Sequence, residues 1–169
     1  MNLEQEITAS DAKSSGDMGS IYSRYCDDAL FVSQVIEMAQ RESLQKDATW
    51  LLKQHFENGH RIDEGQVTNI AKLLPDLTCW ETKLHVLQCL PYITIPSTEK
   101  IGIERFLRTC LVDTNKFVRA WAYNGFYELA LQYPEYMAET KHFFKLAMKD
   151  EAASVKARIR NILKKTNGA

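Results

Sequence analysis

Apolar residues recur every three or four positions over most of this chain, which is the spacing of an amphipathic helix. Polar or helix-breaking stretches interrupt the pattern at 57–60, 73–78, 90–97, 111–115, 132–135 and 149–153. The pattern predicts eight helices, over about residues 22–40, 43–57, 63–74, 78–90, 97–111, 114–132, 134–149 and 151–165. The one alternating stretch, at 92–96, is short and ends in proline, so we expect no strand.

Several of the expected helix starts carry capping residues. Two pairs have the spacing of a capping box, Asp63 with Gln66 and Thr78 with Glu81. Single caps, which would accept free N–H groups of a first turn, are predicted at three further starts by Ser97, Asp113 and Asp150.

Residues 1–20 differ from the rest because they lack a periodic apolar face and contain Ser14, Ser15, Gly16 and Gly19. We predict a flexible or loosely helical lead-in there. Residues 21–169 are predicted to form a single domain, because 169 residues are enough for one sizeable core and too few for two.

The predicted helices repeat in pairs. The stretch that begins at Asp113 aligns with the one that begins at Asp150, and an offset of 36 residues then leads back from Arg119 to Lys83. One more step reaches residues 47–56 weakly. The aligned pairs include Val118 with Val155, Arg119 with Lys156, Ala120 with Ala157 and Asn124 with Asn161. Four helix pairs at a near-constant period are typical of an α-solenoid.

The segment "DTNKFVRAWAYNGFYELA" (113–130) resembles the second helix of a HEAT repeat, and "DEAASVKARIRNIL" (150–163) resembles a degenerate copy. The resemblance implies an all-α fold, an α-α superhelix of about four HEAT-like helical pairs whose second helices line a concave face. It also implies a hydrogen-bonded ladder between adjacent repeats, which would involve Asp113, Arg119, Asp150 and Lys156. Earlier repeats depart from this pattern, since Lys83 has no aligned aspartate at the same spacing and Asp47 replaces the basic residue.

On the helix at 114–132, Val118, Ala122, Gly125 and Leu129 share one face and are predicted to lie in the core. Gly125 would allow a neighbouring helix to approach closely. A second stripe on the same helix consists of Trp121, Asn124 and Glu128, and the repeats before and after it carry polar, charged or aromatic residues at the aligned positions. These candidate binding residues are His85, Gln88, Tyr92, Trp121, Asn124, Glu128, Arg158, Asn161 and Lys165.

Such a stripe suits a protein or peptide partner, because aromatic rings supply buried area and amides supply adaptable hydrogen bonds. The same pattern also fits a solvated helix face whose amides bond to their neighbours. A nucleic-acid-binding protein, conceivably related to the HEAT-like alkylpurine DNA glycosylases, is the alternative. Its support is the basic last helix, with Lys156, Arg158, Arg160, Lys164 and Lys165.

Composition favours a soluble globular protein, with 45% hydrophobic and 25% charged residues and no apolar run of membrane-spanning length. The first residues do not have the pattern of a secretory signal, so a cytoplasmic location is expected. The four cysteines lie in apolar segments and are interpreted as buried, reduced thiols. No metal-ligand pattern, cofactor motif or catalytic motif is present, so we predict a non-catalytic binding scaffold, a monomer or weak homodimer.

Charge is distributed unevenly along the chain. Residues 1–64 carry an excess of acidic groups and residues 139–169 an excess of basic groups, although the net charge is −1. In an elongated fold this difference gives a dipole along the axis, which steers charged partners. Solvated polar faces at the two ends are the simpler interpretation, and we favour it.

Overall fold

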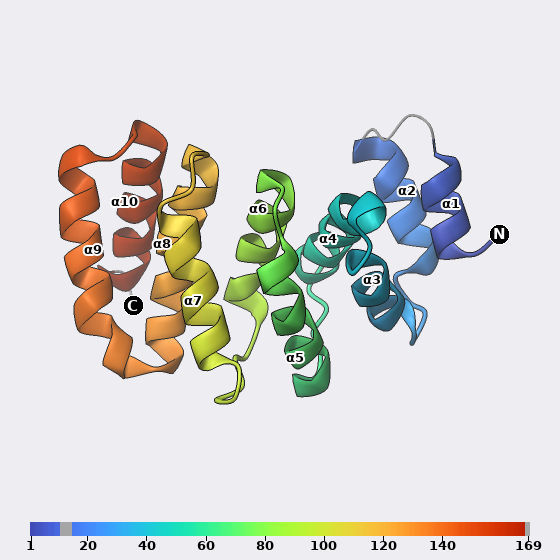
Figure 1. Cartoon of the computed structure of the whole chain (residues 1–169), viewed down its shortest axis with the longest axis horizontal. Coiled ribbons are helices and arrows are strands. Elements are labelled where there is room, and N and C mark those ends of the chain that lie inside the picture. Colours follow the sequence, from blue (N-terminus) through green and yellow to red (C-terminus); the bar gives the residue numbers. More distant parts are fainter. Residues whose placement is uncertain (11–14, 168–169) are drawn as a thin grey trace.

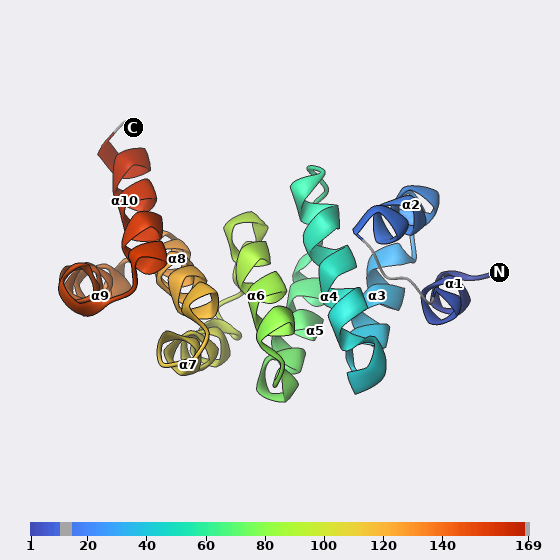
Figure 2. The same ribbon diagram turned by 90° about the horizontal axis from the view of Figure 1, so that it is seen from above.

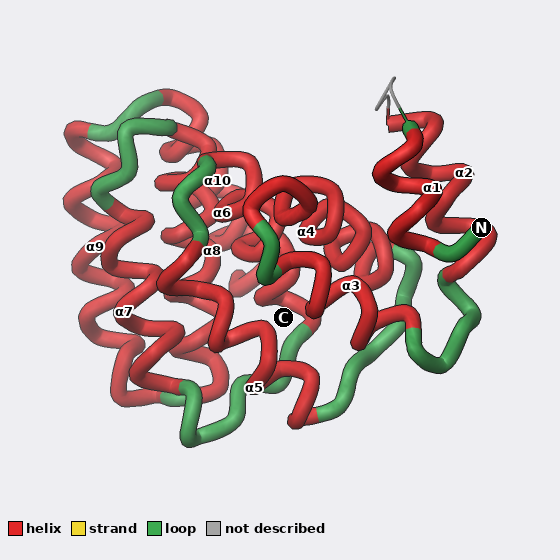
Figure 3. Tube along the Cα trace, turned by 45° about the vertical axis from the view of Figure 1, so that its right-hand side comes forward, coloured by secondary structure: helices red, strands yellow, loops and turns green. Residues whose placement is uncertain are grey.

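The protein is an array of helices that extends along its longest axis from the N-terminal helices at one end to the C-terminal helices at the other (Figure 1). The computed structural model describes residues 1–10 and 15–167, and within these ranges it contains ten α-helices and no strand (Figure 3). The helices are α1 (Leu3–Ala9), α2 (Ser15–Tyr25), α3 (Phe31–Ala39), α4 (Glu42–Glu57), α5 (Glu64–Leu73), α6 (Trp80–Cys89), α7 (Lys100–Leu111), α8 (Lys116–Gln132), α9 (Met137–Asp150) and α10 (Ala153–Asn167). Three single turns of 3₁₀ helix follow α5, α6 and α8, namely η1 (Leu74–Asp76), η2 (Leu90–Tyr92) and η3 (Pro134–Tyr136).

The all-α prediction is confirmed, and the seven helices predicted from residue 43 onward correspond to α4 to α10. The first predicted helix, at 22–40, is instead divided into α2 and α3. Asp28 lies in the turn between them, and its Oδ1 accepts a hydrogen bond from the N–H of Leu30 at 2.8 Å. Because this aspartate bonds the backbone locally, it competes with helix continuation.

The region predicted as a lead-in contains α1 and the first part of α2. Leu3 and Ile7 of α1 are 2% and 0% exposed, and Met18 of α2 is 4% exposed. Asn2 begins α1 with a capping box shared with Gln5. These residues therefore extend the core at the N-terminal end; Ser14 and the rest of 11–14 lie outside the described residues.

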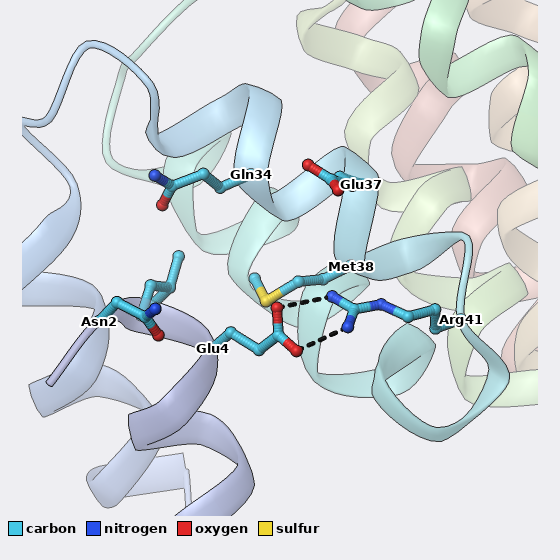
Figure 4. A pocket seen from close by; sticks show the side chains of 7 residues that line it. Asn2, Glu4, Gln34, Glu37, Met38 and Arg41 are labelled. Atoms are coloured by element: carbon cyan, nitrogen blue, oxygen red, sulfur yellow. Dashed lines mark hydrogen bonds and ion pairs between the residues drawn. The ribbon is translucent and has the colours of Figure 1, made fainter.

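An ion pair connects α1 to the start of α4 (Figure 4). Arg41 Nη1 donates to Glu4 Oε1 at 2.6 Å, and Arg41 Nη2 donates to Glu4 Oε2 at 2.9 Å. The hydrogen bond from Arg41 lowers the pKa of Glu4. A cavity of about 180 Å³ lies beside the pair, between α1 and α3. Polar contacts at the surface and apolar contacts beneath thus hold α1 in place.

The even-numbered helices from α4 onward contact one another in series, α4 with α6, α6 with α8, and α8 with α10. At the C-terminal end, α8 and α10 lie on one side and α7 and α9 on the other (Figure 2). One apolar cluster extends from α1 to η3, and a second fills the space between α8, α9 and α10. Helix α8 contributes to both clusters and is the central element of the C-terminal half.

The predicted core face of α8 is confirmed, since Val118, Ala122 and Leu129 are each 0% exposed. Gly125 permits the close approach expected of it. A Cβ at this position would lie 2.4 Å from Leu107 Cδ2 and 3.0 Å from Leu90 Cδ1. The absence of a side chain therefore allows α7 and the end of α6 to pack directly on the α8 backbone.

The predicted capping box of α5 is confirmed. Asp63 Oδ1 accepts from the N–H of Gln66 at 2.8 Å, and Gln66 Oε1 accepts from the N–H of Asp63 at 3.0 Å. The corresponding prediction for Thr78 is wrong, because α6 begins at Trp80 after Cys79, which makes no side-chain cap. Ser97 is also not a cap, since Glu99 precedes the first residue of α7.

Asp113 and Asp150 do not cap the helices predicted for them. Asn115 caps α8, with its Oδ1 2.8 Å from the N–H of Phe117. Asp113 instead accepts from the N–H of Asn115 at 2.8 Å and so organises the loop that precedes the cap. Asp150 is the last residue of α9, which extends one residue further than predicted.

The cysteine prediction is confirmed in part. Cys89 and Cys110 are buried and all four thiols are free. Cys26 is partly buried, and Cys79 is exposed at the start of α6, where its Sγ donates to Glu81. The prediction of a core position for Cys79 is therefore wrong, because the residue precedes the helix and lies outside its apolar face.

Candidate binding groove

A groove of about 120 Å³ lies between α6, α8 and α10, and seven of the nine residues predicted to bind a partner line it. These seven are Gln88, Tyr92, Trp121, Asn124, Glu128, Arg158 and Lys165. Four other residues complete the lining: Glu57, Pro91, Tyr127 and Ile162. The structure thus brings together side chains from four segments that are distant in sequence.

Helical spacing explains why these residues converge. Trp121, Asn124 and Glu128 occupy positions i, i+3 and i+7 of α8, so they share one face of that helix. Arg158 and Lys165 are also seven residues apart, on α10. Because α8 and α10 pack against each other, the two stripes face the same groove.

Arg158 lies over the ring of Trp121, with Cζ 3.9 Å from the ring centroid. This is a cation–π contact, in which the guanidinium plane uses its face and leaves its N–H groups at the edge. Burial lowers the pKa of Arg158. Within the described part of the chain, no acceptor forms a hydrogen bond with this guanidinium. Its donors are therefore open to solvent or to a ligand.

Asn124 lies at the centre of the α8 stripe and is only 8% exposed. Its side-chain amide has no hydrogen-bond partner among the residues that the structure describes. The amide of Gln88, across the groove on α6, is partly buried and likewise has no partner in the described ranges. The polar atoms of both amides remain open to solvent, so both side chains offer a donor and an acceptor to a molecule in the groove.

Glu128 ends the α8 stripe as a partly buried carboxylate. Burial raises the pKa of Glu128, and the positive charge of Lys165 acts in the opposite direction. In residues 1–10 and 15–167, no donor forms a hydrogen bond with this carboxylate. Its burial is therefore a cost to folding that the charge of Lys165 offsets only in part.

Aromatic rings form the walls of the groove. Tyr92 stacks on Phe56, with ring centroids 6.0 Å apart and planes 7° apart, and Arg61 lies 5.8 Å from its centroid. On the opposite side, the hydroxyl of Tyr127 is hydrogen-bonded to Thr166 Oγ1 at 2.9 Å. These contacts fix the rings before any partner arrives, which lowers the entropy cost of binding.

Helical spacing contained a signal for two of the lining residues that the sequence analysis missed. Tyr127 lies three residues after Asn124, and Ile162 lies four residues after Arg158, so each belongs to a stripe already recognised. Glu57 ends α4 and Pro91 lies in η2, and no pattern within either segment predicts that they meet α8.

Two of the predicted binding residues do not line the groove. His85 instead lies against α4, with Nδ1 3.0 Å from Thr49 Oγ1, and burial lowers its pKa to about 4. Asn161 is exposed on α10, and its neighbour Ile162 faces the groove in its place. The row of amides predicted at 88, 124 and 161 is therefore limited to the first two positions in this groove.

Of the predicted ladder, only the contact between Arg119 and Asp113 forms. Arg119 donates to the backbone oxygen of Asp113 at 2.9 Å and reaches the next helix pair through Glu151, with Nε 2.9 Å from Oε1. Asp150, the residue predicted for that position, is not its partner, because it ends α9. Lys156 also pairs differently, since its Nζ donates to the backbone oxygen of Lys149 at 3.1 Å.

Lys83 joins this set, which the sequence did not predict. Its Nζ lies 2.8 Å from Asp113 Oδ2, and both side chains are largely buried. Burial alone would raise the pKa of Asp113, but hydrogen bonds from Lys83 and from the N–H of Asn115 outweigh it and lower the pKa. The contacts Lys83–Asp113–Arg119–Glu151 thus connect three successive even-numbered helices.

Comparison of the chain with protein-family models, with curated proteins and with solved structures finds no match. Among the described residues, no three His, Cys, Asp or Glu side chains are grouped as metal ligands would be. No helix in the described ranges has the length and apolar character needed to cross a membrane.

Proposed function

We propose that this chain is a short HEAT-like α-α superhelix that acts as a non-catalytic scaffold and binds a protein segment or peptide in the groove between α6, α8 and α10. One observation carries the proposal. The side-chain amide of Asn124 forms no hydrogen bond with a described residue and is open to a groove that Arg158 and Glu128 also line. Amide groups placed in this way add to the stability of a complex when a partner forms hydrogen bonds with them.

The HEAT-like part of the proposal is supported by how the helices are connected. The even-numbered helices contact one another in series, and Arg119 links the turn before α8 to the turn before α10. Both features agree with what the sequence resemblance implies. The proposal includes the predicted cytoplasmic location and a monomeric or weakly dimeric state.

Charge balance favours a peptide over a nucleic acid. The groove contains two carboxylates, Glu57 and Glu128, beside two cations, Arg158 and Lys165. A polyanion is attracted by a surface with a clear excess of positive charge. The carboxylate of Asp113 accepts hydrogen bonds from Lys83 and from the N–H of Asn115, which leaves it unsuited to act as a catalytic base.

The test is a hexapeptide array of randomised sequence, probed with the fluorescently labelled chain. A Trp121→Ala/Asn124→Ala variant removes one wall and the central amide of the groove. Its matched control is Trp80→Ala/Asn161→Ala, which changes the same residue types at exposed positions outside the groove. We expect the groove variant to lose at least about tenfold in affinity for the captured peptides and the control to bind as the wild type does.

Circular dichroism of both variants verifies that helical content is retained. Equal binding by the groove variant and the wild type would contradict the proposal. Capture of oligonucleotides with a steep dependence on salt, and of no peptide, would favour the nucleic-acid alternative instead.

A further inference from the structure

The placement of Arg158 is specific enough to indicate the chemistry of the partner. Trp121 covers one face of the guanidinium. The N–H groups lie in the plane of the guanidinium, so this contact uses none of them. An arginine edge with its donors open matches two acceptor oxygens held in one plane. The aromatic ring also limits the rotation of the guanidinium, which prepares it for a partner of that shape.

The surrounding charges indicate how much negative charge the partner carries. Glu57 pairs with Lys53, whose Nζ lies 3.2 Å from its Oε2, and the positive charge of Lys165 acts on Glu128. These pairings leave the charge of Arg158 unmatched, so a group with a single negative charge fits the groove better than a phosphate with two. A carboxylate has both the required charge and two coplanar oxygens.

The amides beside Arg158 indicate what else the partner presents. Asn124 and Gln88 each offer one donor and one acceptor within the same groove. An extended peptide backbone presents N–H and C=O groups in alternation and satisfies such amides irrespective of its side chains. The groove therefore combines a part that recognises any backbone with a part that recognises one acidic group.

We propose that Arg158, held against Trp121, is a carboxylate-binding subsite, and that the groove takes an extended peptide segment whose acidic group pairs with Arg158 while Asn124 and Gln88 hold its backbone. We assign the carboxylate to an Asp or Glu side chain within the extended segment, and a carboxylate from a peptide C-terminus is an alternative outcome of the test. This inference rests on the proposed function, since it specifies which peptides the same groove binds.

The experiment uses the captured hexapeptides as probes in fluorescence anisotropy. Each is synthesised with its acidic residue intact or replaced by the neutral amide, and with a free or an amidated C-terminus. Hydrogen bonds to charged groups have typical strengths that correspond to about a 10- to 100-fold change in affinity. We expect the wild type to lose affinity by this factor when the acidic side chain is neutralised and to tolerate amidation of the C-terminus. A loss on amidation alone would overturn the side-chain assignment.

Two variants of the protein assign the effect to Arg158. Arg158→Gln is expected to bind the acidic and the neutral peptide equally, and Arg158→Lys to retain only part of the preference, because lysine lacks the planar fork. Arg160→Gln is the matched control, since it removes the same charge from an exposed position of α10 outside the groove lining. It is expected to keep the full preference for the acidic peptide.

The outcomes separate this inference from the function on which it rests. If Arg158→Gln keeps the wild-type preference, or if the strongest peptides are neutral, the carboxylate subsite is wrong although peptide binding stands. A phosphoserine peptide that binds more tightly than its glutamate counterpart overturns it in favour of a phosphate. If the array captures no peptide, both proposals fail.

Discussion

Arg119 of α8 and Glu151, which precedes α10, form an ion pair in which Nε lies 2.9 Å from Oε1. Their side chains are 20% and 18% exposed, so the pair is largely shielded from water. Burial alone would raise the pKa of Glu151, but the hydrogen bonds from Arg119 and from the N–H of Ala152, together with the positive charges of Arg119 and Lys156, outweigh burial and lower the pKa. This ion pair thus connects α8 to the turn before α10.

The first prediction concerns this pair. Arg119→Ala is expected to lower the free energy of unfolding by about 1–3 kcal/mol, because it leaves Glu151 largely buried without its partner. Urea denaturation measures the loss. Lys100→Ala is the control, since it breaks a pair with Glu135, whose side chain is 53% exposed, and should cost less than about 1 kcal/mol. Similar losses in both variants would contradict a special role for the Arg119 pair.

Glycine at position 125 is predicted to be required for packing. In Gly125→Ala the new Cβ would lie 2.4 Å from Leu107, which is itself 0% exposed. Overpacking should exceed the gain in helix propensity and destabilise the protein by about 1–2 kcal/mol. Gly102→Ala, in α7, meets nothing within 4 Å and should stabilise it by about 0.5–1 kcal/mol. Thermal denaturation of the two variants should therefore show shifts of opposite sign.

Glu128 is predicted to reduce stability in the unbound protein. Its pKa is raised by burial, so the ionised carboxylate present at neutral pH costs free energy in the folded state. Glu128→Gln should increase the free energy of unfolding by about 0.5–1 kcal/mol. Glu104→Gln should instead lower it by about 1–2 kcal/mol, because Arg108 and Tyr136 both donate to that carboxylate. A loss of stability in both variants would be inconsistent with an uncompensated Glu128.

Two buried histidines predict how stability depends on pH. Burial lowers the pKa of both His55 and His85 from 6.5 to about 4, so the unfolded chain takes up protons below pH 6.5 while the folded chain does not. Stability should therefore be highest above pH 6.5 and should fall as the pH decreases towards 4, by at most about 1.4 kcal/mol per pH unit for each histidine.

Denaturation between about pH 7 and pH 5 measures this slope above the range in which carboxylates titrate in the unfolded chain. His85→Gln, which keeps a polar group near Thr49, should reduce the slope. His142→Gln changes an exposed position of α9 and should retain the wild-type slope. An unchanged slope in His85→Gln would show that the proton uptake occurs elsewhere.

Local sequence patterns predicted most of the helices because each helix carries its own signal. The apolar period of α8 identified Val118, Ala122 and Leu129 as core, and the Asp63–Gln66 box identified the start of α5. Helix α1 was missed because it is short and has only two buried positions, Leu3 and Ile7, which are too few to show a period. The turn around Asp28 was missed because apolar spacing continues on both sides of it.

The candidate groove was predictable where one helix or the repeat supplied the pattern. Helical spacing grouped Trp121, Asn124 and Glu128, and the alignment of repeats added Gln88 and Arg158. The alignment of repeats wrongly placed Asn161 in the groove, because the rotation of α10 about its axis depends on how α10 packs against α8 and α9. That packing places Ile162 towards the groove and leaves Asn161 exposed.

The sequence by itself determined the helical class, the apolar face of each long helix and the polar stripe of α8, because these depend on the order of residues within one segment. Only the tertiary structure decided that Arg158 lies over Trp121 and that Arg119 meets Glu151 rather than Asp150. Contacts between segments depend on how helices rotate and shift against one another. Close packing of buried side chains such as Leu107 against Gly125 fixes those rotations, and no single segment contains that information.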